Sequence, residues 1–420
     1  MNRPPFEVAD VIRQCGAHFQ QVYGPSQSFQ QLRVLQDIVD CRTAAFGGHA
    51  QECDTCGRRE IAYNSCRNRH CPKCQAASRA EWMEAREKEL LPVPYFHVVF
   101  TLPHELGPLA LQNRKVIYGL LFHAAAQTLL KVAADPRHLG AKIGFLAVLH
   151  TWGQNLMHHP HLHVVIPGGG LSPDGSKWIA CRRSRRGKDF FLPVRVLSQV
   201  FRGKFIEGLK QAFNDRRLEF HGRLQGLSKR GSFENVLNQA SRKKWVVYAK
   251  RPFGGPQQVL KYLARYTHRV AISNRRLLRL ENGRVTFRYK DYADAGQQKT
   301  MTLDGTEFLR RFLLHVLPRG FVRIRHYGLL SNRNRHERLH QCRDLLGTDD
   351  TSVDGTMMPN DSAREIDSPD EDDTPIMPCP ECRTGRLITI ELVPATSRTA
   401  IRRPHFLSNR SSRSSFADTS

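Results

Sequence analysis

The amino-acid sequence predicts an α+β protein with a largely antiparallel sheet, preceded by a small cysteine-rich domain and followed by a disordered acidic linker. Three observations predict this class. Apolar strand segments alternate with helical segments over residues 95–346, paired cysteines lie before residue 94, and residues 349–373 are acidic with few large apolar side chains. Because 420 residues exceed one typical core, we expect three regions, at residues 1–94, 95–346 and 347–420.

Hydrophobic periodicity and turn residues indicate the elements in chain order. Apolar residues at helical spacing predict helices over residues 29–46, 109–134, 194–220 and 257–268. Apolar and β-branched runs predict strands over residues 95–101, 143–151, 161–167 and 245–250. Pro160 suits the start of the third strand, where its missing N–H costs nothing, and the glycines at 168–170 end it. Asn282-Gly283 predicts a two-residue hairpin turn between strands at 277–280 and 285–289.

The charge of the chain is large and unevenly distributed. The net charge is +25, but residues 347–420 hold eight basic and thirteen acidic residues, which leaves about +30 on the first 346. A field of that size favours a polyanionic partner, and nucleic acid is the usual one, although a merely basic solvated surface is the alternative. With no secretion signal at the N-terminus and no apolar run of about 20 residues, we expect a cytoplasmic protein without a membrane partner, whose eleven cysteines serve metals.

Two histidines on one predicted strand indicate a metal site. His161 and His163 flank a single leucine, so both imidazoles leave the same face of the strand. Neutral imidazole is the commonest nitrogen ligand of divalent metals in proteins. The alternative is a histidine-rich edge strand without a metal.

The paired cysteines have the spacing of a structural zinc site. Two Cys-x-x-Cys pairs have fourteen residues between them, and their members are Cys53, Cys56, Cys71 and Cys74. Two such pairs can close a tetrahedral thiolate shell, which leaves no open position for a substrate. Four neighbours could bind a second zinc or replace a member of this set: Cys66, His70, Cys41 and His49. A third pair, Cys379 and Cys382, stands alone near the C-terminus and is a weak signal.

Paired tyrosines in the predicted helix at 257–268 complete the pattern. Tyr262 and Tyr266 are four residues apart, which places both phenols on one helix face. Such a pair alone is more often core packing. Beside a two-histidine metal strand in a basic protein, it indicates nucleophiles that attack a DNA phosphodiester, giving a 5′-phosphotyrosine and a free 3′-hydroxyl. Two tyrosines can hold two DNA ends in succession, as rolling-circle strand transfer needs.

With these motifs, the chain resembles the insertion sequence 91 family of rolling-circle transposases, within the His-hydrophobe-His (HUH) superfamily of single-strand endonucleases. The matching stretches run in family order over roughly residues 30 to 346, and they are SCRNRHCPKCQ at 65–75, HTWGQ at 150–154 through HLHVVIPGGG at 161–170, the segment 262–277, and RHYGLL at 325–330. The resemblance implies a catalytic sheet like that of replication initiators and relaxases, flanked by helices, with the nucleophile helix packed across the metal strand. It also implies cleavage of mobile-element ends and transfer of a single DNA strand.

The resemblance assigns the metal ligands and the nucleophiles residue by residue. His161 and His163 match the paired ligands. Tyr262 and Tyr266 match the two nucleophiles, and Tyr262 is the choice if only one is essential. The third ligand in the superfamily is a Glu, Gln or His, often on the neighbouring strand. Gln154 is the first choice, with His150 and His159 behind it, and a site of two His and one Gln would suit Mg²⁺ or Mn²⁺.

Further residues near the tyrosines are candidates for DNA contact. Lys261, Arg265 and Arg269 could lower a phenol pKa or hold a phosphate, although solvated helix charges are the alternative. Asn274 is a further candidate for phosphate contact. The expected partners are single-stranded element ends and target DNA in a bacterial cell, at the nucleoid, and no chemistry is assigned to the last seventy or so residues.

Two other functions remain open at this point. One is a plasmid replication initiator or mobilisation relaxase, which shares the His and Tyr residues but normally lacks the cysteine-rich N-terminal region. The other is a non-catalytic zinc-binding DNA-binding protein, which predicts no dependence on the tyrosines.

Overall fold

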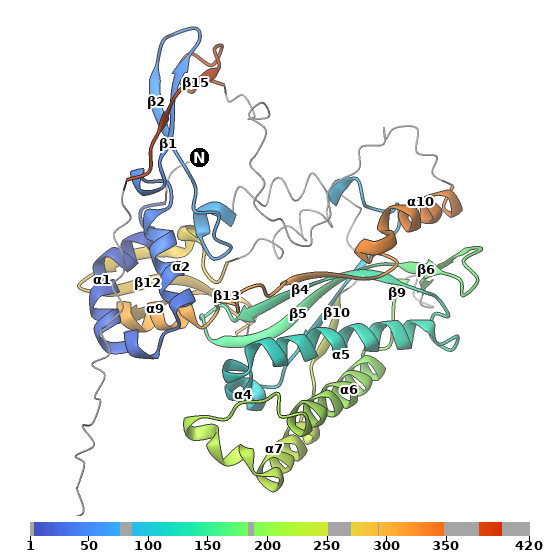
Figure 1. The fold of residues 1–420 in the computed structure, drawn as a ribbon. Coiled ribbons are helices and arrows are strands. Elements are labelled where there is room, and N and C mark those ends of the chain that lie inside the picture. The colour runs from blue at the N-terminus through green and yellow to red at the C-terminus, as the bar shows by residue number, and fades with distance from the viewer. Residues whose placement is uncertain are drawn as a thin grey trace, which may run out of the picture.

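The structure, a computed structural model, is an α+β protein with antiparallel sheets, as predicted (Figure 1). It describes residues 4–75, 86–183, 189–250, 270–292, 294–347 and 378–396. Every strand pairing within these ranges is antiparallel. The expected class is therefore confirmed.

A five-stranded sheet forms the centre of the molecule. Its order is β10-β3-β5-β4-β14, with β3 at Tyr95–Thr101, β4 at Gly144–Trp152, β5 at His158–Pro167, β10 at Val247–Lys250 and β14 at Ile324–Gly328. Four of these strands lie close to their predicted ranges. The edge strand β14 was not predicted, because its polar sequence lacks an apolar run and its pairing with β4 is long-range.

The two faces of this sheet differ in character. Leu162, Val164 and Ile166 of β5 point into the main apolar core, which the sheet shares with the helices that cover this face. His161 and His163 alternate with them and therefore lie on the opposite face. Because side chains alternate along β5, one face of this strand packs against the core and the other face carries the histidines.

Helices cover the packing face of the sheet (Figure 1). They are α4 at Gly107–Gln112, α5 at Arg114–Ala134, α6 at Val194–Asn214 and α7 at Arg230–Arg242. In the described part of the chain, α5 is long and apolar enough to cross a membrane, but here it packs between the sheet and α6 as a core helix. The helix predicted over 194–220 ends early, since Arg216 adopts a left-handed φ of 53°.

A second core joins the N-terminal helices to a later part of the chain. Its elements are α1 at Val8–Tyr23, α2 at Phe29–Asp40, β11 at Leu277–Glu281, β12 at Arg284–Asp291, β13 at Gln297–Asp304 and α9 at Gly305–Leu313. The predicted hairpin turn is confirmed, with left-handed φ values of 50° at Asn282 and 72° at Gly283. Residues from both sides of the boundary expected after residue 94 contribute to this core.

A small sheet projects from the rest of the molecule as an arm (Figure 1). Its order is β15-β1-β2, with β1 at Gly48–Cys53, β2 at Arg59–Tyr63 and β15 at Leu387–Val393. Residues 387–393, from the region expected at 347–420, therefore form a strand that pairs with β1 of the N-terminal region. The remaining elements are β6 at Gly169–Leu171, β7 at Trp178–Ala180, β8 at Arg182–Arg183, β9 at Asp189–Phe190 and α10 at Arg335–Leu345.

His315, just after α9, connects the two cores and makes stability depend on pH. Its Nε2–H donates to the carbonyl of Leu156 at 3.0 Å, and its Nδ1 lies 3.2 Å from the hydroxyl of Thr151. Burial lowers the pKa of His315 to about 4. Because the folded-state pKa lies below the unfolded one of about 6.5, the neutral ring stabilises the fold above pH 6.5 and this contribution is lost as the pH falls toward 4.

We therefore expect His315→Gln, which does not titrate, to flatten the pH dependence of stability. Between pH 7 and pH 5 the wild type should lose about 2 kcal/mol more of its free energy of unfolding than the variant. Urea unfolding at both pH values measures this difference. Equal losses in the two proteins would show that His315 is already protonated, or is accessible, in the folded state.

Candidate active site

Three histidines converge on the face of the central sheet opposite to α5. His150 comes from β4, and His161 and His163 come from β5; we refer to them as the histidine cluster. One ring nitrogen from each lies within 4.8 Å of the others. The strand register explains this convergence, because His150 pairs with His161 and His163 lies two positions along β5 on the same face. The two Nε2 atoms of His161 and His163 are 3.1 Å apart.

Neighbouring groups orient the rings of the cluster. The Nδ1 of His161 lies 2.7 Å from the carbonyl oxygen of His159, and because a carbonyl can only accept, this nitrogen carries the proton. The Nε2 of His161 is then left with a lone pair. The Nδ1 of His163 contacts the Nε2 of His97 at 2.8 Å, and Trp152 stacks on His150 with ring centroids 4.6 Å apart. Such outer contacts are typical of metal-ligating histidines.

The structure places His150, a candidate ranked behind Gln154, beside His161 and His163. Gln154 lies in the turn beyond the end of β4, where its backbone carbonyl accepts a hydrogen bond from Arg276. His159 contributes its backbone carbonyl to the site. The sequence did indicate that His150 lies near His161, because the two predicted strands that carry them are joined by a short turn. His97 was missed, since it lies on a strand distant in sequence.

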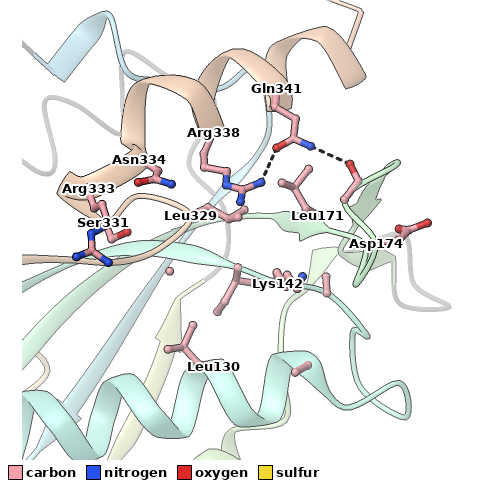
Figure 2. A pocket seen from close by; sticks show the side chains of 15 residues that line it. Leu130, Lys142, Leu171, Asp174, Leu329, Ser331, Arg333, Asn334, Arg338 and Gln341 are labelled. Carbon is pink, nitrogen blue, oxygen red and sulfur yellow. Dashed lines mark hydrogen bonds between the residues drawn. The ribbon is translucent and has the colours of Figure 1, made fainter.

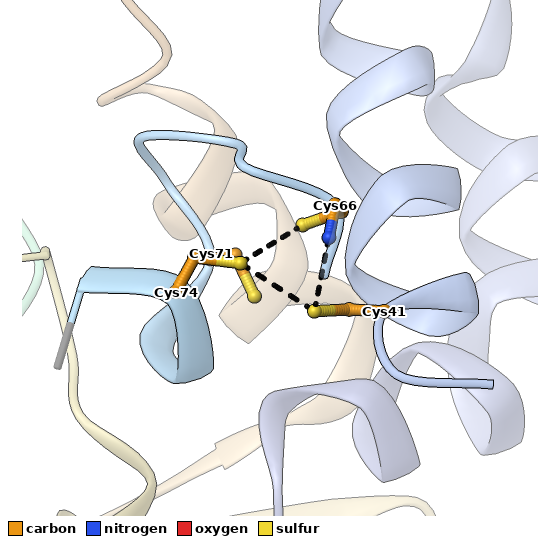
Figure 3. Close-up of side chains that lie close together, drawn as sticks. All are labelled: Cys41, Cys66, Cys71 and Cys74. Carbon is orange, nitrogen blue, oxygen red and sulfur yellow. Dashed lines mark hydrogen bonds between the residues drawn. The ribbon is translucent and has the colours of Figure 1, made fainter. Parts of the chain in front are cut away.

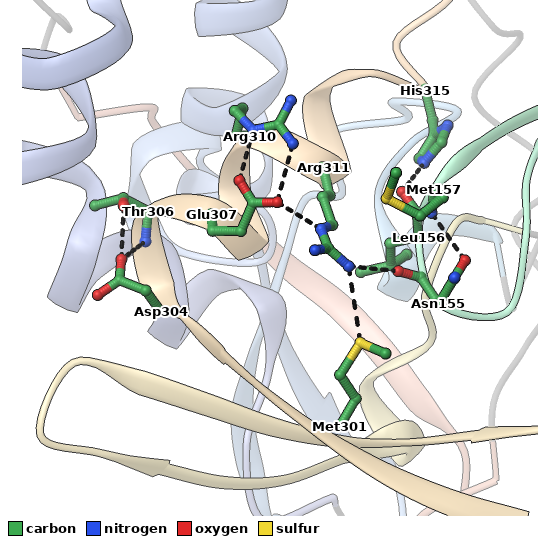
Figure 4. A network of polar contacts seen from close by, with 10 residues as sticks. All are labelled: Asn155, Leu156, Met157, Met301, Asp304, Thr306, Glu307, Arg310, Arg311 and His315. Atoms are coloured by element: carbon green, nitrogen blue, oxygen red, sulfur yellow. Dashed lines mark hydrogen bonds and ion pairs between the residues drawn. The ribbon is translucent and has the colours of Figure 1, made fainter. Parts of the chain in front are cut away.

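Polar contacts hold the turn between β4 and β5 against α9 (Figure 4). Arg311 donates to the carbonyl of Asn155 at 3.2 Å, and Glu307 accepts from both Arg310 and Arg311. These two arginines hold the pKa of Glu307 below its usual value. At Leu156 the turn has a left-handed φ of 63°, and its carbonyl accepts from His315. The two strands that carry the histidine cluster are thus fixed at their connection.

The predicted nucleophiles lie outside the described residues, as do three of the predicted DNA contacts: Tyr262, Tyr266, Lys261, Arg265 and Arg269. The described residue before this segment lies on β10, beside the strand that carries His97, and the residues after it join the second core. Lys250 pairs with His97 on β3, and Ile272 shares the second core with Trp152. Asn274 is described, and its side-chain oxygen accepts from the backbone N–H of Val8 at 3.1 Å, which anchors the start of α1.

Four cysteines form a first cysteine cluster, consisting of Cys41, Cys66, Cys71 and Cys74 (Figure 3). The sulfur of Cys74 lies 3.5 Å from that of Cys41 and 3.5 Å from that of Cys66. A tetrahedral zinc shell with bonds of about 2.3 Å places its sulfurs about 3.8 Å apart, so the spacing fits a zinc ion. The cluster lies at the edge of the second core, beside α2.

The remaining predicted zinc ligands belong to a second cysteine cluster, consisting of Cys53, Cys56, Cys379 and Cys382. The expected single shell of Cys53, Cys56, Cys71 and Cys74 is therefore not formed, since its two pairs lie in different clusters. His70 and His49 belong to neither cluster. His70 is partly buried, and its desolvation together with the nearby Arg69 holds its pKa well below the usual value.

A cavity of about 540 Å³ lies at the other end of β4 (Figure 2). Its lining includes Lys142, Arg333 and Arg338, and Gln341 bridges the cavity wall by accepting from Arg338 and donating to the carbonyl of Gly175. Lys142 lies just before β4, whereas His150 lies near the end of this strand. The histidine cluster is therefore a site separate from this cavity.

The chain matches the models of two known protein families. A family model described as "Transposase zinc-binding domain" matches residues 11–102, and one described as "Putative transposase" matches residues 144–338. The first match contains the first cysteine cluster, and the second contains the histidine cluster. Cys379 and Cys382 lie outside both matches.

Two curated relatives cover most of the chain. "Putative transposase y4qJ" of Sinorhizobium fredii (strain NBRC 101917 / NGR234) is 53% identical over 395 residues, which are 93% of this chain and 96% of the relative. "Transposase for insertion sequence element IS801" of Pseudomonas savastanoi pv. phaseolicola is 26% identical over 335 residues, which are 78% of this chain and 77% of the relative. Among solved structures, a metal-bound conjugative relaxase TrwC in complex with oriT DNA is 14% identical, covers 41% of this chain and 70% of that chain, and has a TM-score of 0.21, too low to carry a conclusion.

Proposed function

The chain belongs to the insertion sequence 91 family of transposases, and on this premise we propose that it cuts and transfers a single DNA strand through a tyrosine nucleophile at the ends of a mobile element. The observation that carries this proposal is the histidine cluster, together with Lys250, which precedes the 251–269 segment and pairs with His97 next to the cluster. That segment contains Tyr262 and Tyr266. A segment of nineteen residues that starts beside His97 is long enough to bring a phenol to the cluster.

In the proposed reaction, the phenol oxygen of Tyr262 or Tyr266 attacks the phosphorus of the scissile phosphodiester. The bond from phosphorus to the 3′-oxygen breaks as the bond to tyrosine forms, the phenol loses its proton, and the 3′-oxygen takes one up. The products are a 5′-phosphotyrosine and a free 3′-hydroxyl. Since the covalent link keeps the bond energy, joining to a second strand needs no nucleotide cofactor, and the second tyrosine can hold a second DNA end.

The residues of the histidine cluster fit a divalent cation. They supply nitrogen ligands from one sheet face, and the proton on Nδ1 of His161 makes Nε2 the nitrogen of this ring that would bind a cation. The bound ion would polarise the scissile phosphate and offset charge in the transition state. His97 and the carbonyl of His159 hold the two β5 rings in place. Because imidazole suits transition metals better than Mg²⁺, we propose that Mn²⁺ supports the reaction better than Mg²⁺.

We assign a structural zinc ion to the first cysteine cluster, where four thiolates close the shell. The zinc region at residues 1–94 then supports DNA binding, and residues 95–346 carry the chemistry. Lys261, Arg265 and Arg269 flank the tyrosines in sequence and are proposed to hold DNA phosphates, with Asn274 as a further candidate. The substrate is single-stranded DNA, and the place of action is the bacterial cytoplasm, at the nucleoid.

A covalent-adduct assay tests this function. The protein is incubated with Mn²⁺ and a labelled single-stranded oligonucleotide that carries the element end, and the adduct is resolved on a denaturing gel. We expect the wild type to form an adduct, and the Tyr262→Phe, Tyr266→Phe double variant to form none, because phenylalanine has no nucleophilic oxygen. The matched control is Tyr248→Phe. Tyr248 is exposed and pairs with Val99, which in turn pairs with His163, so it lies on the same sheet face.

Each outcome of this assay has a clear meaning. An adduct that persists in the double variant shows that another residue is the nucleophile. If the adduct is lost in Tyr248→Phe but kept in the double variant, then the nucleophile is Tyr248 on β10. The single variants Tyr262→Phe and Tyr266→Phe then show whether one phenol suffices for cleavage.

A further inference from the structure

The arm formed by β15, β1 and β2 contains a second set of four converging thiols. The sulfur of Cys53 lies 3.7 Å from that of Cys382, and the sulfur of Cys56 lies 3.7 Å from that of Cys379. These distances fit the edges of a tetrahedral thiolate shell and are too long for disulfides. We propose that the second cysteine cluster binds a zinc ion of its own, which fastens the C-terminal strand β15 to the N-terminal arm.

The two cysteine pairs adopt the same backbone turn, although they lie more than 300 residues apart. The N–H of Gly57 donates to the carbonyl of Cys53 at 3.0 Å, and the N–H of Arg383 donates to the carbonyl of Cys379 at 3.0 Å. In each pair the residue after the second cysteine is left-handed, with a φ of 71° at Gly57 and 60° at Arg383. A non-glycine residue rarely adopts this conformation, so the repeated turn indicates a shared requirement.

Backbone N–H groups also point at the sulfurs, as a bound thiolate requires. The Sγ of Cys53 accepts from the N–H of Thr55 at 3.4 Å and from that of Cys56 at 3.5 Å. The Sγ of Cys382 accepts from the N–H of Gly385 at 3.2 Å. Donors aimed at sulfur stabilise its anionic form, which is the form that binds a metal.

The arm has little else to hold it together. Its buried apolar core consists of Cys53, Cys379 and Leu387, with Cys382 packed against them. On β15 the side chains of Ile388, Ile390 and Leu392 are more than half exposed, so they contribute little burial. A salt bridge from Arg58 to Glu381 at 2.7 Å is exposed and therefore weak. A segment with so small a core needs a metal to fix its structure.

This zinc site differs from the one assigned to the first cysteine cluster and does not depend on the proposed strand transfer. It joins residues of the N-terminal region to residues beyond both family matches. The C-terminal segment is thereby part of the N-terminal arm, and not a free tail after the acidic linker.

Zinc content and thiol alkylation of the full-length protein test the proposal together. We expect two zinc ions per chain in the wild type and one in the Cys379→Ser, Cys382→Ser double variant. Cys56 is solvent-exposed, so its resistance to iodoacetamide in the native protein would have to come from the metal. In the double variant, Cys53 and Cys56 should become reactive, while Cys41, Cys66, Cys71 and Cys74 stay protected. Cys181→Ser, outside both clusters, is the matched control and should keep both ions.

Two results would overturn the proposal. One is a double variant that retains both zinc ions. The other is a wild-type protein in which Cys56 is alkylated as fast before a zinc chelator is added as after it. This second measurement uses the unmodified chain, so it decides the question even if the double variant does not fold. Loss of the DNA adduct in tyrosine variants bears only on the strand-transfer function and leaves this site untouched.

Discussion

His150→Ala and His161→Ala are each expected to reduce adduct formation about a thousandfold, whereas Gln154→Ala changes it less than about threefold. Removal of a metal ligand forfeits several kcal/mol of transition-state stabilisation, and about 4 kcal/mol corresponds to a thousandfold in rate. His150 and His161 face each other across β4 and β5, with ligand atoms in the histidine cluster, while Gln154 lies in the turn. DNA affinity should remain nearly unchanged, since phosphate contacts supply most of it.

Adduct yield against time, at a series of Mn²⁺ concentrations, measures this prediction. His123→Ala is the matched control, because His123 is an exposed histidine on α5, on the other side of the sheet. If Gln154→Ala abolishes the adduct and His150→Ala does not, then the glutamine and not the histidine completes the site. High Mn²⁺ should partly restore the ligand variants and leave the tyrosine variants inactive.

Cys71→Ser is expected to abolish zinc binding at the first cysteine cluster and to unfold the N-terminal core. Structural zinc sites contribute on the order of 10 kcal/mol, which is comparable to the whole stability of a domain. Cys41, Cys71 and Cys74 are buried in the core that holds α1, α2 and α9, so the damage would spread through that core. The variant should therefore lose solubility and DNA binding, and the loss of chemistry should follow from these.

Zinc analysis and thermal unfolding of Cys71→Ser and Cys181→Ser measure the effect. The control removes a thiol that belongs to neither cysteine cluster and should unfold at nearly the wild-type temperature. A Cys71→Ser protein with wild-type stability and one zinc ion fewer would show that the ion is not needed for the core. A variant with unchanged zinc content would remove Cys71 from the shell.

The parts of the structure that depend on local sequence were predictable. Strand β3 occupies its predicted range at Tyr95–Thr101, and the Asn282-Gly283 turn forms as expected, because alternation and turn chemistry are short-range signals. Placement of His161 and His163 on one face followed from the same alternation. His150 was also within reach, since the turn between its strand and β5 is short enough for their register to be inferred.

Long-range partners could not be predicted in this way. Spacing alone grouped Cys71 and Cys74 with Cys53 and Cys56, whereas the fold groups them with Cys41 and Cys66. The sequence around Cys379 and Cys382 does not indicate that the other two cysteines of their cluster lie more than 300 residues earlier. Likewise, α1 was not among the predicted helices, and its own sequence does not show that its partner is α9. Which distant segments contact each other is decided by tertiary packing, and this cannot be read from the residues near either segment.

The pairing of α1 with α9 has a consequence for how the nascent chain matures. Because α1 ends at Tyr23 and α9 begins at Gly305, about 280 residues separate the two helices. At 5–20 residues per second, the ribosome needs roughly 15 to 55 s to deliver the second helix after the first. During that interval the apolar stripe of α1 lacks its final neighbour and is open to chaperones or proteases. Translation that stops before residue 305 should therefore yield a fragment that aggregates, whatever its metal supply.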